Sequence, residues 1–227
     1  MTTDEGNDHV ASSPCMLSEL NPDGTLRVDP VQAQDVARWR KAERERLLAA
    51  RGGFTEEYRS QQALAIAHAL DQILSTFASV IVSVYWPIRG EPDLREWAHT
   101  LSQKGIQIAL PVAAALGQPL VFREWQAGAR LARGLWKIPY PADGAEVIPH
   151  VVIAPLVGFD RDCYRLGYGG GFFDRTLAKL SPRPLAIGVG YPSAALCTIF
   201  PQPRDVPMDW IVTGSSPSVR RAEVSKA

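Results

Sequence analysis

The sequence predicts a three-layer α/β/α protein built on a largely parallel, Rossmann-like sheet. Strand-like and helix-like segments alternate between residues 36 and 213, which is the pattern of parallel α/β folds. The segment 151–157 (VVIAPLV) is continuously apolar, as expected of a strand buried on both faces. A glycine-rich loop at 165–171 precedes a short helical segment, and such loops favour anion binding at a helix N-terminus.

The first two elements of the domain are helices. One is expected over 36–51, where apolar residues form a partial stripe beside arginines and glutamates. Gly52 and Gly53 end it, because glycine accepts the left-handed conformation that follows a helix. Thr55 is a suitable N-cap for the next helix, which is expected to run to about Phe77.

Strands and a helix follow in alternation. The β-branched run 79–85 (SVIVSVY) predicts the first strand. Pro92 opens the next helix and Gly105 stops it. Strands are then expected over 106–110 and 120–125.

The second half of the domain repeats this alternation. The buried strand 151–157 leads into the glycine-rich loop at 165–171 and a short helix over 172–180. Two more strands are expected over 185–189 and 210–213.

Ligands of such sheets bind at the carboxyl ends of the strands. That rule brings together the turn after Tyr85, the loop after Val157 and the segment after Val189.

The chain divides into one α/β domain over 36–215, an N-terminal extension over 1–35 and a C-terminal tail over 216–227. The formal net charge is zero, yet residues 1–35 carry seven acidic side chains against one arginine, so the rest of the chain is net positive by six. The extension lacks an apolar period and is expected to be loosely ordered. The alternative is that it folds over the basic body.

The composition argues against several classes of protein. A neutral chain is atypical of a general nucleic-acid binder. No apolar run approaches the roughly 18–20 residues of a membrane span, and the N-terminus does not resemble a signal peptide. Three cysteines far apart fit a reducing compartment. We therefore expect a cytoplasmic protein, either monomer or homodimer, that binds neither nucleic acid nor membrane.

The strongest chemical signal is the loop RLGYGGGFFDR, which runs from Arg165 to Arg175. Four glycines in five positions let the backbone approach a ligand, and their N–H groups form an anion cradle. Asp174 offers a hard oxygen for Mg²⁺ that bridges phosphates. The loop lacks the Walker A ending and the dinucleotide glycine spacing. On the residues alone, a glycine-rich turn capped by Asp174 remains an alternative.

The wider segment, RLGYGGGFFDRTL after PLVGFD, resembles the nucleotide-binding signature of the 5-formyltetrahydrofolate cyclo-ligase family. The resemblance extends from about residue 36 to 213, and its other pieces follow in the family's order. They are RWRKAERERLLAARGGFTEEYR, YWPIRGEPDLREWA, LPV, LARGLWKIPYP and IGVGYPSAALCTIFPQPRDVPMDWIVT.

The resemblance implies an ATP- and Mg²⁺-dependent conversion of 5-formyltetrahydrofolate, a reduced folate, to 5,10-methenyltetrahydrofolate, with release of ADP and phosphate. Phosphorylation of the formyl oxygen is expected to come first, because it turns a poor leaving group into a good one. Two alternatives stay open. One is a non-catalytic folate- or nucleotide-binding regulatory homologue, and the other is an ATP-dependent enzyme that acts on another N-formyl substrate.

The resemblance also implies roles for individual residues. Catalytic roles fall on Arg165, Tyr168 and Asp174, and Mg²⁺ binding falls on Asp174 and Asp205. ATP binding is implied for Arg40, Arg165, Leu166, Gly167, Tyr168, Gly169, Gly170, Gly171, Phe172 and Phe173. Substrate binding is implied for Trp86, Glu91, Tyr168, Gly169, Gly170, Gly171 and Phe172.

Several of these residues have a plainer interpretation. Asp205 could be a turn residue between two prolines. Glu91 either accepts hydrogen bonds from the pterin ring or is a solvent-facing turn residue. Trp86 and Tyr85 either pack on the pterin or belong to the core.

The first helix is the most ambiguous segment. Arg40 matches an arginine that reaches phosphate or substrate. Its neighbours Lys41, Arg44 and Arg46 are expected to form a solvated helix face.

The sequence departs from the family pattern at four positions. Val36 replaces a lysine that contacts ATP, and it shares a side of the helix with Arg40. Ala194 stands where the family has glutamine, and Arg204 where histidine is frequent. Gly170 stands where some members have lysine, although glycine is also common there.

Overall fold

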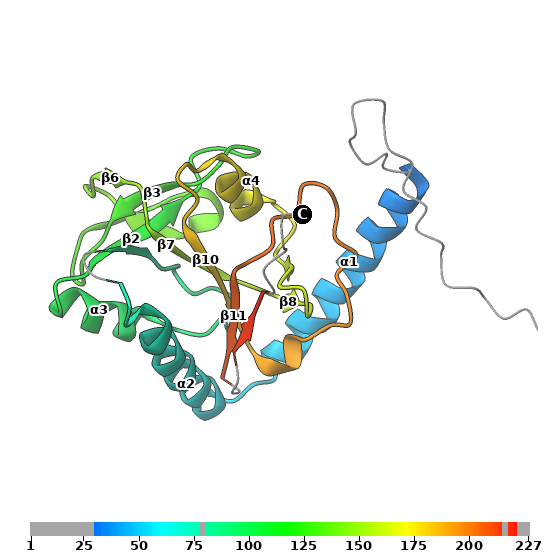
Figure 1. The fold of residues 1–227 in the computed structure, drawn as a ribbon, viewed down its shortest axis with the longest axis horizontal. Helices are drawn as coiled ribbons and strands as arrows, with labels where there is room; N and C mark the ends of the chain where they lie inside the picture. Colours follow the sequence, from blue (N-terminus) through cyan, green and yellow to red (C-terminus); the bar gives the residue numbers. More distant parts are fainter. Residues whose placement is uncertain (1–29, 78–79, 215–217, 222–227) are drawn as a thin grey trace, which may run out of the picture.

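A computed structural model describes residues 30–77, 80–214 and 218–221 of the protein (Figure 1). The predictions made for residues 1–29 and 222–227 lie outside the described residues. The division of the chain into 1–35, 36–215 and 216–227 stays a prediction.

Five parallel strands form the centre of an eight-stranded sheet. In spatial order they are β11 (Trp210–Thr213), β10 (Leu185–Gly190), β7 (Val151–Pro155), β1 (Ile81–Ser83) and β2 (Gln107–Val112). Antiparallel strands complete the two sides: β12 (Val219–Arg220) beside β11, then β3 (Val121–Glu124) and β6 (Glu146–Val147) beyond β2. The predicted α/β class with a mostly parallel sheet is confirmed.

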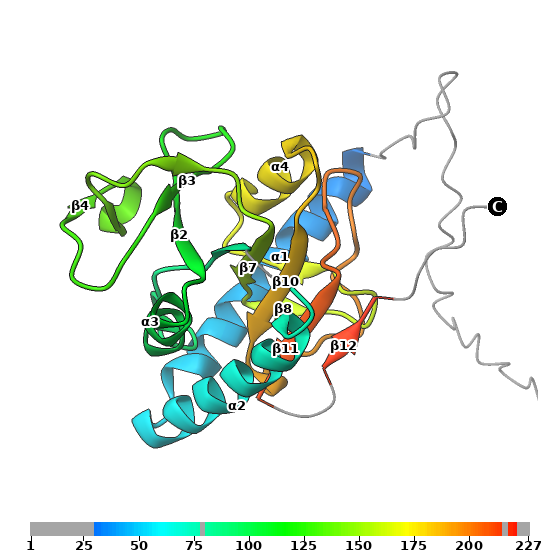
Figure 2. The same cartoon turned by 60° about the vertical axis from the view of Figure 1, so that its left-hand side comes forward.

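Helices cover both faces of this sheet (Figure 2). Val151 and Ile153 of β7 belong to the core that α2 (Glu56–Leu74) and α3 (Arg95–Gln103) share with one face. The alternate residue Val152 packs on the opposite face, in a core that includes Leu177 of α4 (Phe172–Lys179). Alternation of buried residues on both faces explains why this strand reads as a continuous apolar run.

Helix α1 (Pro30–Gly52) begins six residues before the predicted start at 36. Proline is well suited to the first turn of a helix, where its missing N–H is not needed. Thr55 caps α2 as predicted, because its side chain accepts a hydrogen bond from the Tyr58 N–H. Helix α3 begins later than Pro92, since the Asp93 carboxylate accepts the Arg95 N–H and so places the helix start at Arg95.

Two short antiparallel ribbons had no counterpart in the sequence prediction. One pairs β4 (Leu131–Arg133) with β5 (Pro139–Pro141), and the other pairs β8 (Gly158–Phe159) with β9 (Arg165–Leu166). Strands of two or three residues are too short to carry a recognisable period. Both ribbons nonetheless border the cavity described below.

The segments that follow β1, β7 and β10 meet at the carboxyl ends of the strands, as predicted. The Tyr191 hydroxyl, after β10, donates to the Gly90 carbonyl, after β1, at 2.9 Å. The Leu156 carbonyl, after β7, accepts a hydrogen bond of 2.6 Å from Arg51 at the end of α1. Within the described residues, no helix combines the length and apolar character needed to cross a membrane.

Candidate active site

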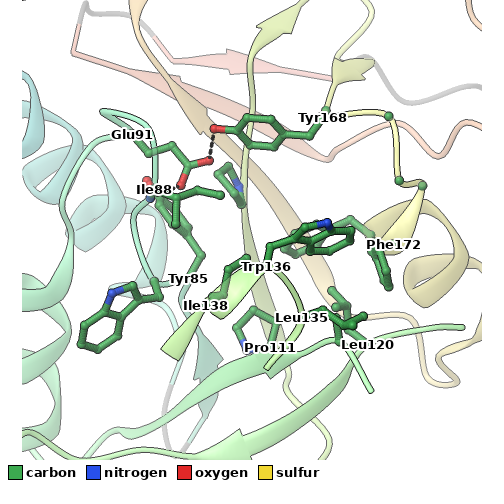
Figure 3. A pocket seen from close by; sticks show the side chains of 18 of the residues that line it. Tyr85, Ile88, Glu91, Pro111, Leu120, Leu135, Trp136, Ile138, Tyr168 and Phe172 are labelled. Atoms are coloured by element: carbon green, nitrogen blue, oxygen red, sulfur yellow. Dashed lines mark hydrogen bonds between the residues drawn. The ribbon is translucent and has the colours of Figure 1, made fainter. Parts of the chain in front are cut away.

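A cavity of about 620 Å³ opens at the carboxyl ends of β1, β2 and β7 (Figure 3). The glycine-rich loop borders it, and so does the β4–β5 ribbon, whose connection carries Leu135, Trp136 and Ile138. The lining contains the side chains of four arginines and three carboxylates: Arg40, Arg44, Arg89, Arg165, Glu91, Asp174 and Asp205. This excess of positive charge suits a polyanionic ligand.

The glycine-rich loop wraps closely around arginine side chains. A Cβ atom at Gly167 would lie 2.5 Å from Nη1 of Arg165, so a larger residue cannot fit without displacing that guanidinium. Gly171 has a φ of 63° and is the N-cap of α4. Only glycine adopts this conformation readily, and the first N–H groups of α4 are left without a side-chain cap. The loop therefore leaves backbone donors available for an anion.

Helix α1 sends two arginines into this region. Arg44 donates from Nε to the Gly167 carbonyl at 2.6 Å and lines the cavity. The prediction that Arg44 lies on a solvated helix face is wrong, because the glycine-rich loop packs over this side chain. Burial, together with the charge of Arg40, lowers the pKa of Arg44. Lys41 and Arg46 are exposed, as predicted.

Each carboxylate proposed for Mg²⁺ is held by an arginine. Arg40 makes two bonds to Asp205, 2.5 Å from Nη2 to Oδ2 and 3.2 Å from Nη1 to Oδ1. Arg165 donates from Nη2 to Oδ2 of Asp174 at 3.0 Å. Asp205 also accepts the Gln202 N–H at 2.6 Å, so it caps its own turn in addition to pairing with Arg40. The turn interpretation and the site interpretation of Asp205 are therefore compatible.

The Asp174 carboxylate lies beside the backbone that follows Asp205. Oδ1 of Asp174 accepts a bond of 3.4 Å from the N–H of Val206, the residue after Asp205. Hard carboxylate oxygens are suitable ligands for Mg²⁺, which usually takes one or two of them and completes its shell with phosphate and water. No cluster of three or more potential ligands exists among the described residues. The pair fits a metal that arrives with a phosphate ligand.

Glu91 is a buried carboxylate rather than a solvent-facing turn residue, with only 4% of its surface exposed. Its Oε1 accepts the Tyr168 hydroxyl at 2.9 Å and its Oε2 accepts the Ile88 N–H at 2.9 Å. Burial raises the pKa of Glu91 from 4.5 to about 7, and these two bonds with the Arg51 charge limit the rise. Figure 3 shows the carboxylate and the phenol pointing toward one another at the rim of the cavity.

The aromatic residues beside Glu91 belong both to the core and to the cavity. Tyr85 is buried, donates its hydroxyl to the Pro92 carbonyl at 2.7 Å and lines the cavity. Trp86 lines the cavity as well, lies edge-on to Trp125 and carries the Arg95 guanidinium over its ring. The two alternatives left open by the sequence are thus not exclusive.

Two residues of the site were not predicted from the sequence. Arg51 is 2% exposed and donates from Nη1 to the Tyr168 hydroxyl at 3.2 Å. Trp136 is 62% exposed and lies edge-on to Phe172, with the ring centres 5.4 Å apart. Arg51 had no distinguishing signal among the arginines of α1. Trp136 had one, because it lies in the segment LARGLWKIPYP, which resembles a mid-chain signature of the family.

The positions that depart from the family pattern lie in different environments. Val36 is a buried residue, 7% exposed, and Ala194 is part of the core that contains Leu177. Arg204 is exposed. Gly170 lines the cavity, and its carbonyl accepts a hydrogen bond from Arg175. None of the first three lines the cavity.

The family model described as "5-formyltetrahydrofolate cyclo-ligase family" matches residues 36–214. The 5-formyltetrahydrofolate cyclo-ligase of Mycolicibacterium smegmatis is 34% identical over 140 residues, which are 58% of this chain and 72% of that protein. The 5-formyltetrahydrofolate cyclo-ligase of Escherichia coli is 30% identical over 141 residues, 59% of this chain and 78% of that protein.

A solved structure gives the same indication. The NMR structure of Aquifex aeolicus 5,10-methenyltetrahydrofolate synthetase superposes with a TM-score of 0.69 at 27% sequence identity. The similarity covers 80% of this chain and 92% of that one.

Proposed function

Because the chain belongs to the 5-formyltetrahydrofolate cyclo-ligase family, we propose that it converts 5-formyltetrahydrofolate to 5,10-methenyltetrahydrofolate with ATP and Mg²⁺. The formyl oxygen attacks the γ-phosphorus of ATP and ADP leaves. N10 of the folate then attacks the activated formyl carbon, the phosphate leaves with the former formyl oxygen, and the proton of N10 is lost with it. The sum of the two steps is one methenyl product, one ADP and one phosphate.

One observation carries the proposal: a single cavity holds an anion-binding region and a region suited to a pterin. The first is the glycine-rich loop with the guanidinium groups of Arg40, Arg44 and Arg165. The second is the Glu91–Tyr168 pair. Phosphoryl transfer to a formyl oxygen requires both ligands side by side with their charge compensated, rather than an additional nucleophile from the protein.

The folate half of the site is assigned to Glu91. Each of its oxygens accepts one hydrogen bond within the protein, at 2.9 Å, which leaves each a further acceptor position. A pterin presents a row of N–H donors along one edge, and a fixed carboxylate matches such a row. Trp136 and Phe172 offer an apolar surface for the flat rings of the same ligand.

The phosphate half is assigned to the loop and its arginines. Arg165 is buried, and its Nε atom has no hydrogen-bond partner within the described residues. Asp174 and Asp205 would hold Mg²⁺. The metal, when bound, screens the charge of the phosphates and polarises the transferring group. Arg165 and Arg40 pair with these carboxylates, so both guanidinium groups lie where they would bind phosphate oxygens beside the metal.

Arg44 supports the catalytic alternative over the regulatory one. The regulatory alternative rests on Val36, which removes a cation of the family pattern. Arg44 lies on the same side of α1, two turns after Val36, and contacts Gly167. A cation therefore remains beside the loop although the lysine position is lost.

The test is the ATP-dependent formation of the methenyl chromophore from 5-formyltetrahydrofolate by the full chain with Mg²⁺. We expect turnover with ATP, none without it, and at least a hundredfold loss in Asp174→Ala. Arg46→Ala, an exposed change on α1, is the control and should retain full turnover. Folded protein that binds ATP and folate in calorimetry without turnover would favour the regulatory alternative. ADP release with another N-formyl compound, and not with 5-formyltetrahydrofolate, would favour an ATP-dependent enzyme that acts on a different N-formyl substrate.

A further inference from the structure

Arg51 connects four segments that meet at the cavity. It lies at the end of α1 and donates from Nη2 to the Leu156 carbonyl at 2.6 Å, directly after β7. It donates from Nη1 to the Tyr168 hydroxyl of the glycine-rich loop at 3.2 Å. Its guanidinium also lies over the Tyr191 ring, which follows β10, with 5.9 Å to the ring centre.

The chemistry of arginine fixes the direction of the hydrogen bonds that follow. A guanidinium can only donate, so the Tyr168 oxygen accepts from Arg51. The phenol proton is then directed to the other polar partner that this oxygen has among the described residues, Oε1 of Glu91 at 2.9 Å. Arg51, Tyr168 and Glu91 therefore form a chain with a single donor direction.

We propose that Arg51 is a positioning residue for substrate binding, which orients Tyr168, favours the ionised form of Glu91 and aligns its carboxylate for the pterin. This inference rests on the proposed function, because it takes Glu91 as the group that binds the folate. Arg51 does not line the cavity itself, so its effect on the substrate must pass through its bond to Tyr168 or through the effect of its charge on Glu91.

Because Arg51 and Glu91 are shielded from solvent, an ionised Glu91 needs the nearby charge of Arg51. Arg51 and Glu91 are both more than nine-tenths buried, and burial disfavours an isolated carboxylate. The Arg51 charge lowers the pKa of Glu91 against that effect. The other titratable or charged groups near Glu91 include Tyr168, Arg89, Tyr85 and Tyr191, and the Arg59 guanidinium lies beside Gly90. Of these, the Arg89 charge also lowers the pKa of Glu91.

Two substitutions separate the charge of Arg51 from its shape. Arg51→Lys keeps a cation but loses the planar fork that reaches Leu156 and Tyr168 together. Arg51→Met removes both. We expect Arg51→Met to raise the KM for 5-formyltetrahydrofolate about tenfold or more, the scale of one lost charge-assisted hydrogen bond. The KM for ATP should stay within about twofold, a change too small to mark a lost hydrogen bond.

The pH profile gives a readout that a purely structural role would not change. The acidic limb of kcat/KM should follow Glu91 of the free enzyme, and Arg51→Met should move it to higher pH by about one pH unit. Arg51→Lys should leave that limb in place while still raising the KM for the folate. Arg46→Met on the same helix is the matched control, and it should alter neither quantity.

A double-mutant cycle with Tyr168→Phe tests the route of the effect. If Arg51 acts through the phenol, Arg51→Lys should have little further effect on the folate KM once Tyr168 is phenylalanine. An equal effect of Arg51→Lys in both backgrounds would overturn the proposal. If Arg51→Met does not fold, the cycle of Arg51→Lys and Tyr168→Phe still tests the proposal.

A measurement without substrates separates this inference from the proposed function. The Glu91 carboxylate can be titrated by ¹³C NMR in the full chain, with Glu91→Gln used to assign its signal. We expect a higher pKa of Glu91 in Arg51→Met than in the wild type and Arg51→Lys. An unchanged Glu91 titration in Arg51→Met would overturn the inference even if the enzyme turns over. Loss of the proposed function alone would leave the titration result standing.

Discussion

Arg40 and Asp205 form a two-bonded ion pair although 165 positions separate them in the sequence. Arg40 also donates to the carbonyls of Ile199 and Phe200, so the guanidinium fixes the whole segment that leads to Asp205. The pair is mostly shielded from solvent, with side-chain exposures of 12% and 17%. It joins the first helix to the loop that precedes β11, on the side of the cavity proposed to bind phosphate.

Removing the acidic partner should therefore affect both stability and nucleotide use. Asp205→Ala leaves a largely buried guanidinium without its carboxylate, which costs roughly 3 kcal/mol of unfolding free energy. It also removes one proposed Mg²⁺ ligand, so we expect a rise of at least tenfold in the Mg²⁺ concentration needed for half-maximal turnover. Denaturant unfolding and a Mg²⁺ titration measure the two effects. An unchanged Mg²⁺ dependence would limit Asp205 to the structural role.

The raised pKa of Glu91 predicts that the stability of the fold depends on pH. Its folded pKa, about 7, is raised above the ordinary value of 4.5, so its neutral form favours the folded state. That contribution is complete below pH 4.5 and is lost as the pH rises through about 7. Relative to Glu91→Gln, the wild type should lose about 3 kcal/mol of unfolding free energy over this range. Urea unfolding of both proteins between pH 4.5 and 8 tests this, and parallel curves would contradict it.

Trp136 should contribute to ligand binding without contributing to stability. It is largely exposed and has a positive φ of 55°, yet it lines the cavity beside Phe172. We expect Trp136→Ala to raise the KM for the folate about tenfold, the order expected of a lost aromatic contact, while the Tm changes little. Leu64→Ala, at an exposed apolar position on α2, is the control and should leave the KM unchanged.

The elements predicted best are those whose local pattern and tertiary role agree. The strand expected at 210–213 matches β11 (Trp210–Thr213) residue for residue. The expected helix at 172–180 differs from α4 (Phe172–Lys179) by one residue. Both elements bury an apolar face in the sheet core, and burial produces the sequence periods on which such predictions rely.

The site was harder to predict, because partners far apart in sequence define its side chains. Arg44, Arg46 and Arg51 look alike in one basic helix, but only the fold shows that Arg44 contacts Gly167 and Arg51 contacts Leu156 while Arg46 is exposed. The short β4–β5 ribbon that carries Trp136 has too few residues for a period. The resemblance to the family identified the residues of the glycine-rich loop, and the structure showed which arginines of α1 contact that loop.

Arg44 is expected to be the second cation of the phosphate half. Arg44→Met removes a guanidinium that bonds the Gly167 carbonyl and lines the cavity. We expect about a tenfold weaker affinity for an ATP analogue by calorimetry, consistent with one lost charge-assisted contact. Arg38→Met, an exposed residue paired with Asp35, serves as the control and should leave the affinity unchanged. Equal affinity in Arg44→Met would exclude a role for Arg44 in nucleotide binding.

Val36→Lys, which restores the family residue, should not improve nucleotide binding in this chain. Val36 is 7% exposed, so a lysine there must either bury its ammonium or displace its neighbours. Arg40 and Arg44 follow on the same side of the helix, and Arg40 already lowers the pKa of Arg44. A third cation would add to this repulsion. We expect a loss of about 1–3 kcal/mol in unfolding free energy and no gain in ATP affinity. Tighter binding of ATP by Val36→Lys at unchanged stability would show instead that the lysine position remains open to the phosphates.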